Sequence, residues 1–306
     1  RALGVAPNAR FYVANVFNDQ NKTKLSVILE ALQWIINPDS NPNTDDGAEI
    51  ITHSWGYTKS PIGTEKPLWD ATIALKKMNV LNVFPAGDNG PKIDSLQSPG
   101  AYPHVIAVGA VDRELNELIY SAKGPSKWEN VSYNKPDFYA PAFQVESTLP
   151  GSIYGRTNGT KVAAALLAGS LTLIKQSNPK LSWQEILKIT QQSGFSKYNK
   201  NTIPQVHSAS ILARNGAKVS VQIEGTSDET SSVILLDENR TFTASTMGYV
   251  EFYLREGSYR VAYTAKGYAP KIGQINVIAQ QNQRLTVKLE KSELLELNIS
   301  AYDSQN

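Results

Sequence analysis

The sequence predicts an α/β domain with a mostly parallel sheet flanked by helices, followed by a smaller antiparallel β-sandwich. In the first part of the 306-residue chain, near-continuous apolar runs alternate with amphipathic helical patterns, as in buried parallel strands joined by helices. From Val219 onward, short alternating runs recur about every ten residues between turn residues, which is typical of a sandwich. We therefore predict domains at 1–215 and 216–306.

The elements of the first domain follow from these patterns. Apolar runs predict strands at 10–17, 50–56, 80–84 and 103–112. Helical spacing predicts helices at 25–36, 68–78, 162–174 and 181–191. The last helix has a capping box, because Glu185 follows Ser182 by three residues.

The second domain shows alternation instead of helical spacing. Its predicted strands are 219–223, 232–236, 249–254, 259–263, 275–278 and 285–289. A last alternating stretch at 294–302 fits either the first strand of a further module or a final edge strand of the same sandwich.

Composition excludes several classes of function. The net charge of +2 gives no indication of a nucleic acid or an anionic membrane as partner. The absence of cysteine excludes disulfides, cysteine nucleophiles and thiolate metal sites. The longest apolar run, 162–174, is too short for a membrane span.

One loop has spacing that suggests a cation. Asp39, Asn41, Asn43 and Asp45 alternate as oxygen ligands do in calcium loops, although Pro42 disturbs the pattern. Asx-rich turns without a metal give the same spacing. We expect no cofactor, with calcium at these four residues as the weaker alternative.

Several motifs point to one family. A Gly-Thr turn opens an apolar helix at 159–169, and Gly-Val-Ala-Pro stands at 4–7. Ser-Trp-Gly at 54–56, Ala-Gly-Asp-Asn-Gly at 86–90 and a long apolar strand at 102–112 lie between them. In this order, over residues 3–213, the motifs resemble those of the subtilisin-like serine proteases. The segment 246–268 resembles carboxypeptidase-regulatory-like (transthyretin-like) β-sandwich modules.

The resemblance implies a degenerate catalytic site. It places Lys161 at the nucleophilic serine and Asp88 at the asparagine of the oxyanion hole. The family's Asp and His segments come before Gly-Val-Ala-Pro and are absent from this chain. Because lysine has no hydroxyl for acyl transfer, we expect no catalysis. We also expect Lys161 and Asp88 to form an ion pair that fills the former site.

The same resemblance implies a peptide groove. Its candidate residues are Ser54, Trp55, Gly56, Ala86 and Gly87. A histidine next to these residues, His53, could also face the cleft.

We therefore interpret the chain as a non-catalytic pseudoprotease of the peptidase S8 family. We expect it to have a structural, scaffolding or peptide- or protein-binding role outside the cytoplasm, at the cell surface or in the extracellular space. Glycosylation sequons at Asn21, Asn130, Asn158, Asn239 and Asn298 favour export weakly. One alternative is an active serine endopeptidase completed by a separate N-terminal fragment. Another is a subunit of an extracellular surface assembly that makes contacts through its sandwich edges.

Overall fold

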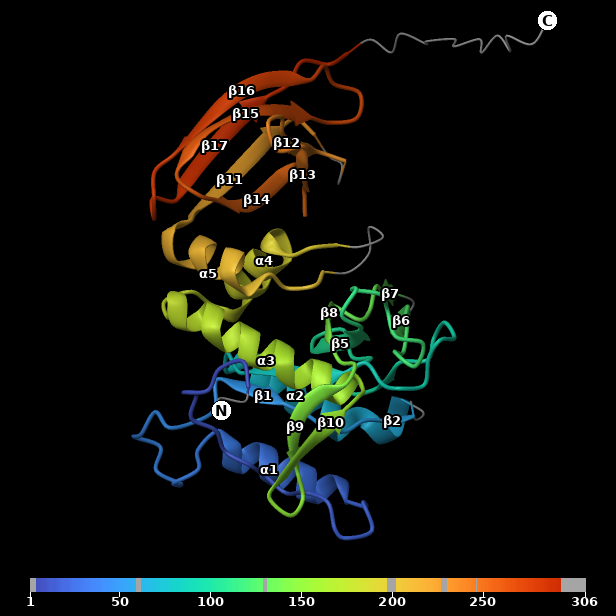
Figure 1. The fold of residues 1–306 in the computed structure, drawn as a ribbon. Helices are drawn as coiled ribbons and strands as arrows, with labels where there is room; N and C mark the ends of the chain where they lie inside the picture. Colours follow the sequence, from blue (N-terminus) through green and yellow to red (C-terminus); the bar gives the residue numbers. More distant parts are fainter. Residues whose placement is uncertain are drawn as a thin grey trace, which may run out of the picture. The chain divides into compact units, whose positions relative to one another are not determined.

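The protein is described by a computed structural model, in which residues 4–58, 62–128, 131–196, 202–226, 230–245 and 247–292 are described. Two compact units divide the chain, Arg1–Ala213 and Arg214–Asn306 (Figure 1). The stretch 294–302, predicted as a strand, lies outside the described residues.

A four-stranded parallel sheet is at the centre of the first unit. Its order is β1 (Ile50–Thr52), β3 (Leu81–Pro85), β5 (Ile106–Val111) and β8 (Phe138–Pro141). β3 and β5 are buried along nearly their whole length, as their near-continuous apolar runs predict. The predicted α/β class is confirmed.

Five helices are described in the first unit and at its C-terminal boundary. They are α1 (Leu25–Ile35), α2 (Ile62–Lys77), α3 (Thr160–Ser177), α4 (Trp183–Ser193) and α5 (Val206–Asn215). α1 and α2 share an apolar cluster with Ile51 and Phe84 of the sheet. α3 contacts all four strands of the sheet and lies on its other side from α1 (Figure 1). The four helices predicted in this domain are present, although α2 begins six residues before the predicted residue 68.

Short antiparallel pairs surround the sheet, and the sequence patterns did not predict them. They are β2 (Tyr57–Thr58) with β4 (Gln97–Ser98), β6 (Ser126–Trp128) with β7 (Val131–Tyr133), and β9 (Val145–Leu149) with β10 (Ile153–Thr157). The β9–β10 hairpin leads directly into α3, the helix of the candidate site.

The prediction of a buried strand at 10–17 is wrong. This segment is not part of a strand, and Phe11 and Val13 are 82% and 74% exposed. Tyr12 and Val16 face the protein instead: Tyr12 contacts the ring of Trp34, and Val16 packs on the α1–α2 cluster. An apolar run becomes a strand only when a neighbouring strand completes its backbone hydrogen bonds. No described strand pairs with this segment.

The predicted strand at 50–56 is too long. β1 ends at Thr52, and residues 53–56 have no regular structure before β2 begins at Tyr57. Of these four residues, Ser54, Trp55 and Gly56 line the candidate site, and His53 packs beneath it.

The second unit contains two sheets around one apolar core. One sheet has the order β14 (Tyr249–Leu254), β11 (Ala217–Glu224), β17 (Gln283–Lys288). The other has the order β13 (Arg240–Thr243), β12 (Ser232–Leu235), β15 (Gly257–Thr264), β16 (Lys271–Val277). Residues of both sheets, among them Val221, Phe252 and Val261, share the core.

Two details of this unit differ from the sequence prediction. The patterns missed β13, which pairs with β12 in an antiparallel arrangement. β11 and β17 pair in parallel, whereas the other paired strands described in this unit are antiparallel. Pairing of the first strand with the last is a long-range contact, so alternation within each strand cannot indicate its direction.

None of the helices in the described part of the chain is both long and apolar enough to cross a membrane.

Candidate functional site

The Gly-Thr turn before α3 depends on glycine. Gly159 has φ 119° and ψ 160°, a conformation that other residues rarely adopt. A Cβ atom at this position would lie 3.1 Å from Asp88 Oδ2. Glycine therefore allows the loop after β3 to approach the first residue of the helix.

Two hydrogen bonds join that loop to α3. The backbone N–H of Thr160 donates to Asp88 Oδ1 at 2.8 Å, and the backbone N–H of Gly87 donates to Thr160 Oγ1 at 3.2 Å. The first amides of a helix have no partner within the helix, and a carboxylate is favoured near this positive end. Asp88 thus caps α3 from a distant part of the chain.

The predicted ion pair between Lys161 and Asp88 is not formed. The ion pairs described for this chain do not include it. One oxygen of Asp88 is engaged by the amide of Thr160. Successive helical side chains project about 100° apart around the axis. The exposed Lys161 side chain lines a cavity that Asp88 does not line.

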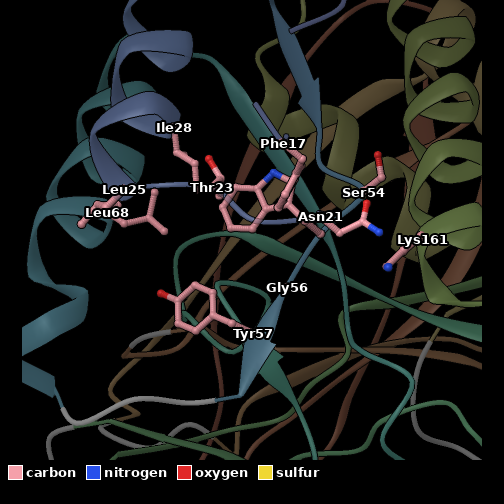
Figure 2. Close-up of a pocket in the computed structure, with 11 residues that line it drawn as sticks. Phe17, Asn21, Thr23, Leu25, Ile28, Ser54, Gly56, Tyr57, Leu68 and Lys161 are labelled. Atoms are coloured by element: carbon pink, nitrogen blue, oxygen red, sulfur yellow. The ribbon is translucent and has the colours of Figure 1, made fainter. Parts of the chain in front are cut away.

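That cavity, which we call the Lys161 cavity, has a volume of about 790 Å³. It is lined by Phe17, Asn21, Thr23, Leu25, Ile28, Ser54, Trp55, Gly56, Tyr57, Leu68 and Lys161. Figure 2 shows that Leu25, Ile28 and Leu68 occupy one end, whereas Asn21, Ser54 and Lys161 lie at the other. The volume is in the range typical of ligand pockets, about 300–1,000 Å³.

The five predicted groove residues separate into two sets. Ser54, Trp55 and Gly56 line the Lys161 cavity. Ala86 is fully buried and Gly87 is buried, and neither of them lines the cavity.

Sequence analysis missed Gln97 of β4, whose side chain lies between these two sets. A Cβ at Gly56 would be 3.1 Å from Gln97 Oε1, and a Cβ at Gly87 would be 2.6 Å from Gln97 Cγ. Gln97 therefore fills the space between Gly56 and Gly87. No feature of the single sequence distinguishes this glutamine, since its position depends on the pairing of β2 with β4.

His53 belongs to the core and not to the cleft. It is 6% exposed, its ring stacks 3.8 Å from that of Phe84, and its Nε2 lies 3.2 Å from Asn82 Oδ1. Burial lowers the pKa of His53 to about 4, against the opposing hydrogen bond with Asn82. The ring of Trp55 meets those of His53 and Phe84 edge-on, with centroids 5.4 and 5.5 Å apart. His53 thus supports the wall of the Lys161 cavity from behind.

The candidate calcium loop is closed by its own hydrogen bonds. Asp39 Oδ1 accepts from the backbone N–H of Asn41 at 2.8 Å, and Asn41 Oδ1 accepts from that of Asn43 at 3.1 Å. The Thr44 hydroxyl also donates to Asp39 at 3.0 Å. These are Asx turns, which form without a metal. In the described residues, no group of three or more His, Cys, Asp or Glu side chains is arranged to hold a metal ion.

The fold and the glycine-dependent helix start are those of a subtilisin-like protein. Consistent with this, the profile of the subtilase family matches residues 1–233. The chain therefore belongs to the subtilase family, and the predicted fold is confirmed.

Curated relatives are proteases from bacilli and related bacteria. Over 184 residues the chain is 33% identical to Subtilisin BL of Lederbergia lenta and to an alkaline protease of Alkalihalobacillus alcalophilus. These alignments cover 60% of this chain, and 59% and 42% of the two relatives. Serine protease AprX of Bacillus subtilis is 28% identical over 232 residues, covering 68% of this chain and 51% of AprX. The chain thus spans about half the length of these relatives.

Solved structures show the same fold. The self-cleaved protease domain of PatA is similar with a TM-score of 0.56 at 24% identity, covering 69% of this chain and 76% of that domain. The prenylagaramide maturation protease PagA has a TM-score of 0.51 at 21% identity, covering 63% of this chain and 69% of that protein.

Proposed function

We propose that this chain is a non-catalytic subtilase that binds extended peptide or protein segments outside the cytoplasm. The observation that carries the proposal is the position of Lys161. It is the second residue of α3, follows the Gly-Thr turn, and lines the cavity where the family resemblance places the nucleophile. An ammonium group in place of a serine hydroxyl cannot carry out the family's acyl transfer.

The geometry of Asp88 supports the same proposal. Its carboxylate caps α3, next to the place where an oxyanion donor is expected. Loss of one such donor costs a factor of about 10²–10³ in rate, and an anionic side chain would also repel the developing oxyanion. The site thus has neither a hydroxyl nucleophile at Lys161 nor a neutral donor at Asp88.

The features that favour binding are the cavity and its wall. Trp55 gives the cavity an aromatic surface, and apolar side chains cover one end of it. Segments bound in this way use exposed backbone groups for affinity and pockets for specificity. The second unit would then act as a spacer or a further binding surface, as sandwich modules commonly do.

The alternative is an active serine endopeptidase completed by a separate fragment, and the protease names of the relatives favour it. A fluorophosphonate probe separates the two functions, because it labels only an activated serine. We expect no labelling of this chain under conditions that fully label Subtilisin BL. Covalent labelling of the chain at a serine, located by mass spectrometry, would overturn the non-catalytic proposal.

Binding is tested separately with extended peptides at millimolar concentration. We expect chemical-shift changes for Trp55 and its neighbours. The exposed Trp34, which does not line the cavity, is the internal control. If no peptide of a diverse set perturbs the spectrum or the melting temperature, the binding role is contradicted.

A further inference from the structure

The polar end of the Lys161 cavity has free hydrogen-bonding capacity. The Asn21 amide, the Ser54 hydroxyl and the Lys161 ammonium group lie at this end (Figure 2). Among the described residues, none forms a hydrogen bond with the side chain of Asn21 or Ser54, and the bond recorded for Asn21 is made by its backbone. These two groups and the ammonium can therefore all donate to a ligand.

The charge of the cavity comes from one residue. Lys161 is the charged member of the 11 lining residues, and no acidic side chain in the described part of the chain forms an ion pair with it. Asp88, the acid that lies close to the start of α3, is held by the Thr160 amide. The cavity thus has an apolar end and a cationic end.

The packing of Gln97 restricts where a ligand can lie. Gln97 occupies the space between Gly56 and Gly87, so a side chain cannot enter there without displacing it. Gln97 does not line the open volume, whose walls include Trp55 and the side chains of Leu25, Ile28 and Leu68. A ligand in this volume places its apolar part against these side chains and its polar part near Lys161.

We propose that Lys161 makes this cavity a binding site for a carboxylate group, carried by a peptide next to an apolar or aromatic residue. This inference rests on the proposed binding function and specifies its ligand. A carboxylate can accept from the ammonium, the Asn21 amide and the Ser54 hydroxyl together, and such charge-assisted bonds are stronger than neutral ones. The carboxylate comes either from a peptide C-terminus or from an acidic side chain.

Matched peptides test the proposal on the full chain. One pair is acetyl-Ala-Ala-Leu-Phe with a free C-terminal acid or a C-terminal amide. The second pair is acetyl-Ala-Leu-Phe-Glu amide and its Gln analogue. We expect at least one acidic peptide to bind about ten-fold more tightly than its neutral partner, equivalent to about 1.4 kcal/mol. The preference should decrease as salt screens the interaction.

Variants of the exposed Lys161 identify the group responsible. Lys161→Gln should remove the preference for each acidic peptide over its neutral partner. Lys161→Arg, which keeps the charge, should retain the preference. Lys180→Gln is the matched control, because Lys180 is also exposed in the same unit and does not line the cavity.

Each outcome is decisive. A preference in the first pair identifies the C-terminal carboxylate, and one in the second pair identifies the side-chain carboxylate. Equal binding within both pairs, or a preference that survives Lys161→Gln, overturns the carboxylate inference and leaves the binding function standing. If none of the four peptides binds, the carboxylate inference is overturned, and the diverse peptide set decides the binding function.

Discussion

At His53, a buried ring links the core to the wall of the Lys161 cavity. The ring stacks on that of Phe84, meets that of Trp55 edge-on, and forms a hydrogen bond with Asn82. Because burial disfavours the charged imidazolium, the folded protein keeps His53 neutral down to a pKa of about 4, against an ordinary value of 6.5. Acidification should therefore lower the free energy of unfolding of this region, because the unfolded chain takes up a proton at His53 before the folded chain does.

We predict that His53 makes the first unit sensitive to acid. Between pH 4 and 6.5 the unfolded chain binds a proton at His53 that the folded chain does not. The contribution of neutral His53 to the free energy of unfolding is therefore complete above pH 6.5. It decreases as the pH falls towards 4, by at most about 3 kcal/mol. Unfolding midpoints of the wild type and His53→Gln, measured from pH 7 to pH 4, should show a smaller decrease in the variant.

The control is His207→Gln, since His207 is exposed on α5. Its pH dependence should follow that of the wild type. If His53→Gln and wild type lose stability in parallel, the neutral buried state of His53 is contradicted.

A second residue-scale prediction concerns the buried pair of Lys135 and Asp137. Lys135 Nζ donates to Asp137 Oδ2 at 2.7 Å and to the Val105 carbonyl at 2.6 Å, and the lysine side chain is 2% exposed. Removal of one partner of such a pair costs about 3–5 kcal/mol, because the other charge remains buried. Asp137→Asn should therefore lower the free energy of unfolding by about this amount in urea titrations.

The exposed pair of Lys66 and Asp70 provides the comparison. It also has a short contact of 2.9 Å, but its side chains are 71% and 56% exposed. Asp70→Asn should change stability by only about 0–1 kcal/mol, because water screens an exposed pair. Equal effects of the two substitutions would mean that the Lys135–Asp137 pair is not buried.

At the scale of elements, α3 is held at its first residue by a cap from another loop. Asp88 accepts from the Thr160 amide, and the Thr160 hydroxyl accepts from Gly87. Both bonds connect the end of β3 to the start of α3, so this arrangement fixes where Lys161 projects. The cap is thus a structural feature of the site even without catalysis.

We predict that Asp88→Ala destabilises the first unit by about 1 kcal/mol, the typical cost of losing a helix cap. The cost should be the same in the wild-type and Lys161→Gln backgrounds, because no ion pair joins the two residues. Urea unfolding of the four proteins in this double-mutant cycle measures the coupling. A coupling energy above about 0.5 kcal/mol would show that Lys161 and Asp88 interact after all.

At the scale of the whole molecule, each unit has its own core. Leu171 of α3 is fully buried in the first unit. Phe252 of β14 is fully buried in the second and stacks on Phe242, with centroids 4.3 Å apart. Because the cores are separate, a cavity made in one unit should lower the stability of that unit before it affects the other.

We predict that Leu171→Ala and Phe252→Ala shift different thermal transitions. Each substitution should cost about 2–5 kcal/mol, the range for emptying a buried position. Near-ultraviolet circular dichroism should report mainly the first unit, because all five tryptophans lie between Trp34 and Trp183. That signal should melt earlier in Leu171→Ala and at the wild-type temperature in Phe252→Ala. Equal shifts by both variants would indicate one cooperative unit.

The sequence by itself determined the features that depend on local pattern. Apolar runs located β3 and β5, helical spacing located α1 and α3, and the Ser182–Glu185 capping box marks the start of α4 as observed. The Gly-Thr turn identified the start of the site helix and therefore Lys161. These features are determined within a few residues of the chain, by which side of an element is buried and how its end is capped.

Only the tertiary structure decided which groups meet. It left the apolar segment 10–17 without a strand partner among the described residues, and it paired β11 with β17 in parallel. It also directed Asp88 to the amide of Thr160 instead of the ammonium of Lys161, and placed Gln97 between Gly56 and Gly87. Each of these results depends on residues distant in sequence competing for the same backbone group or the same space, which a local pattern does not encode.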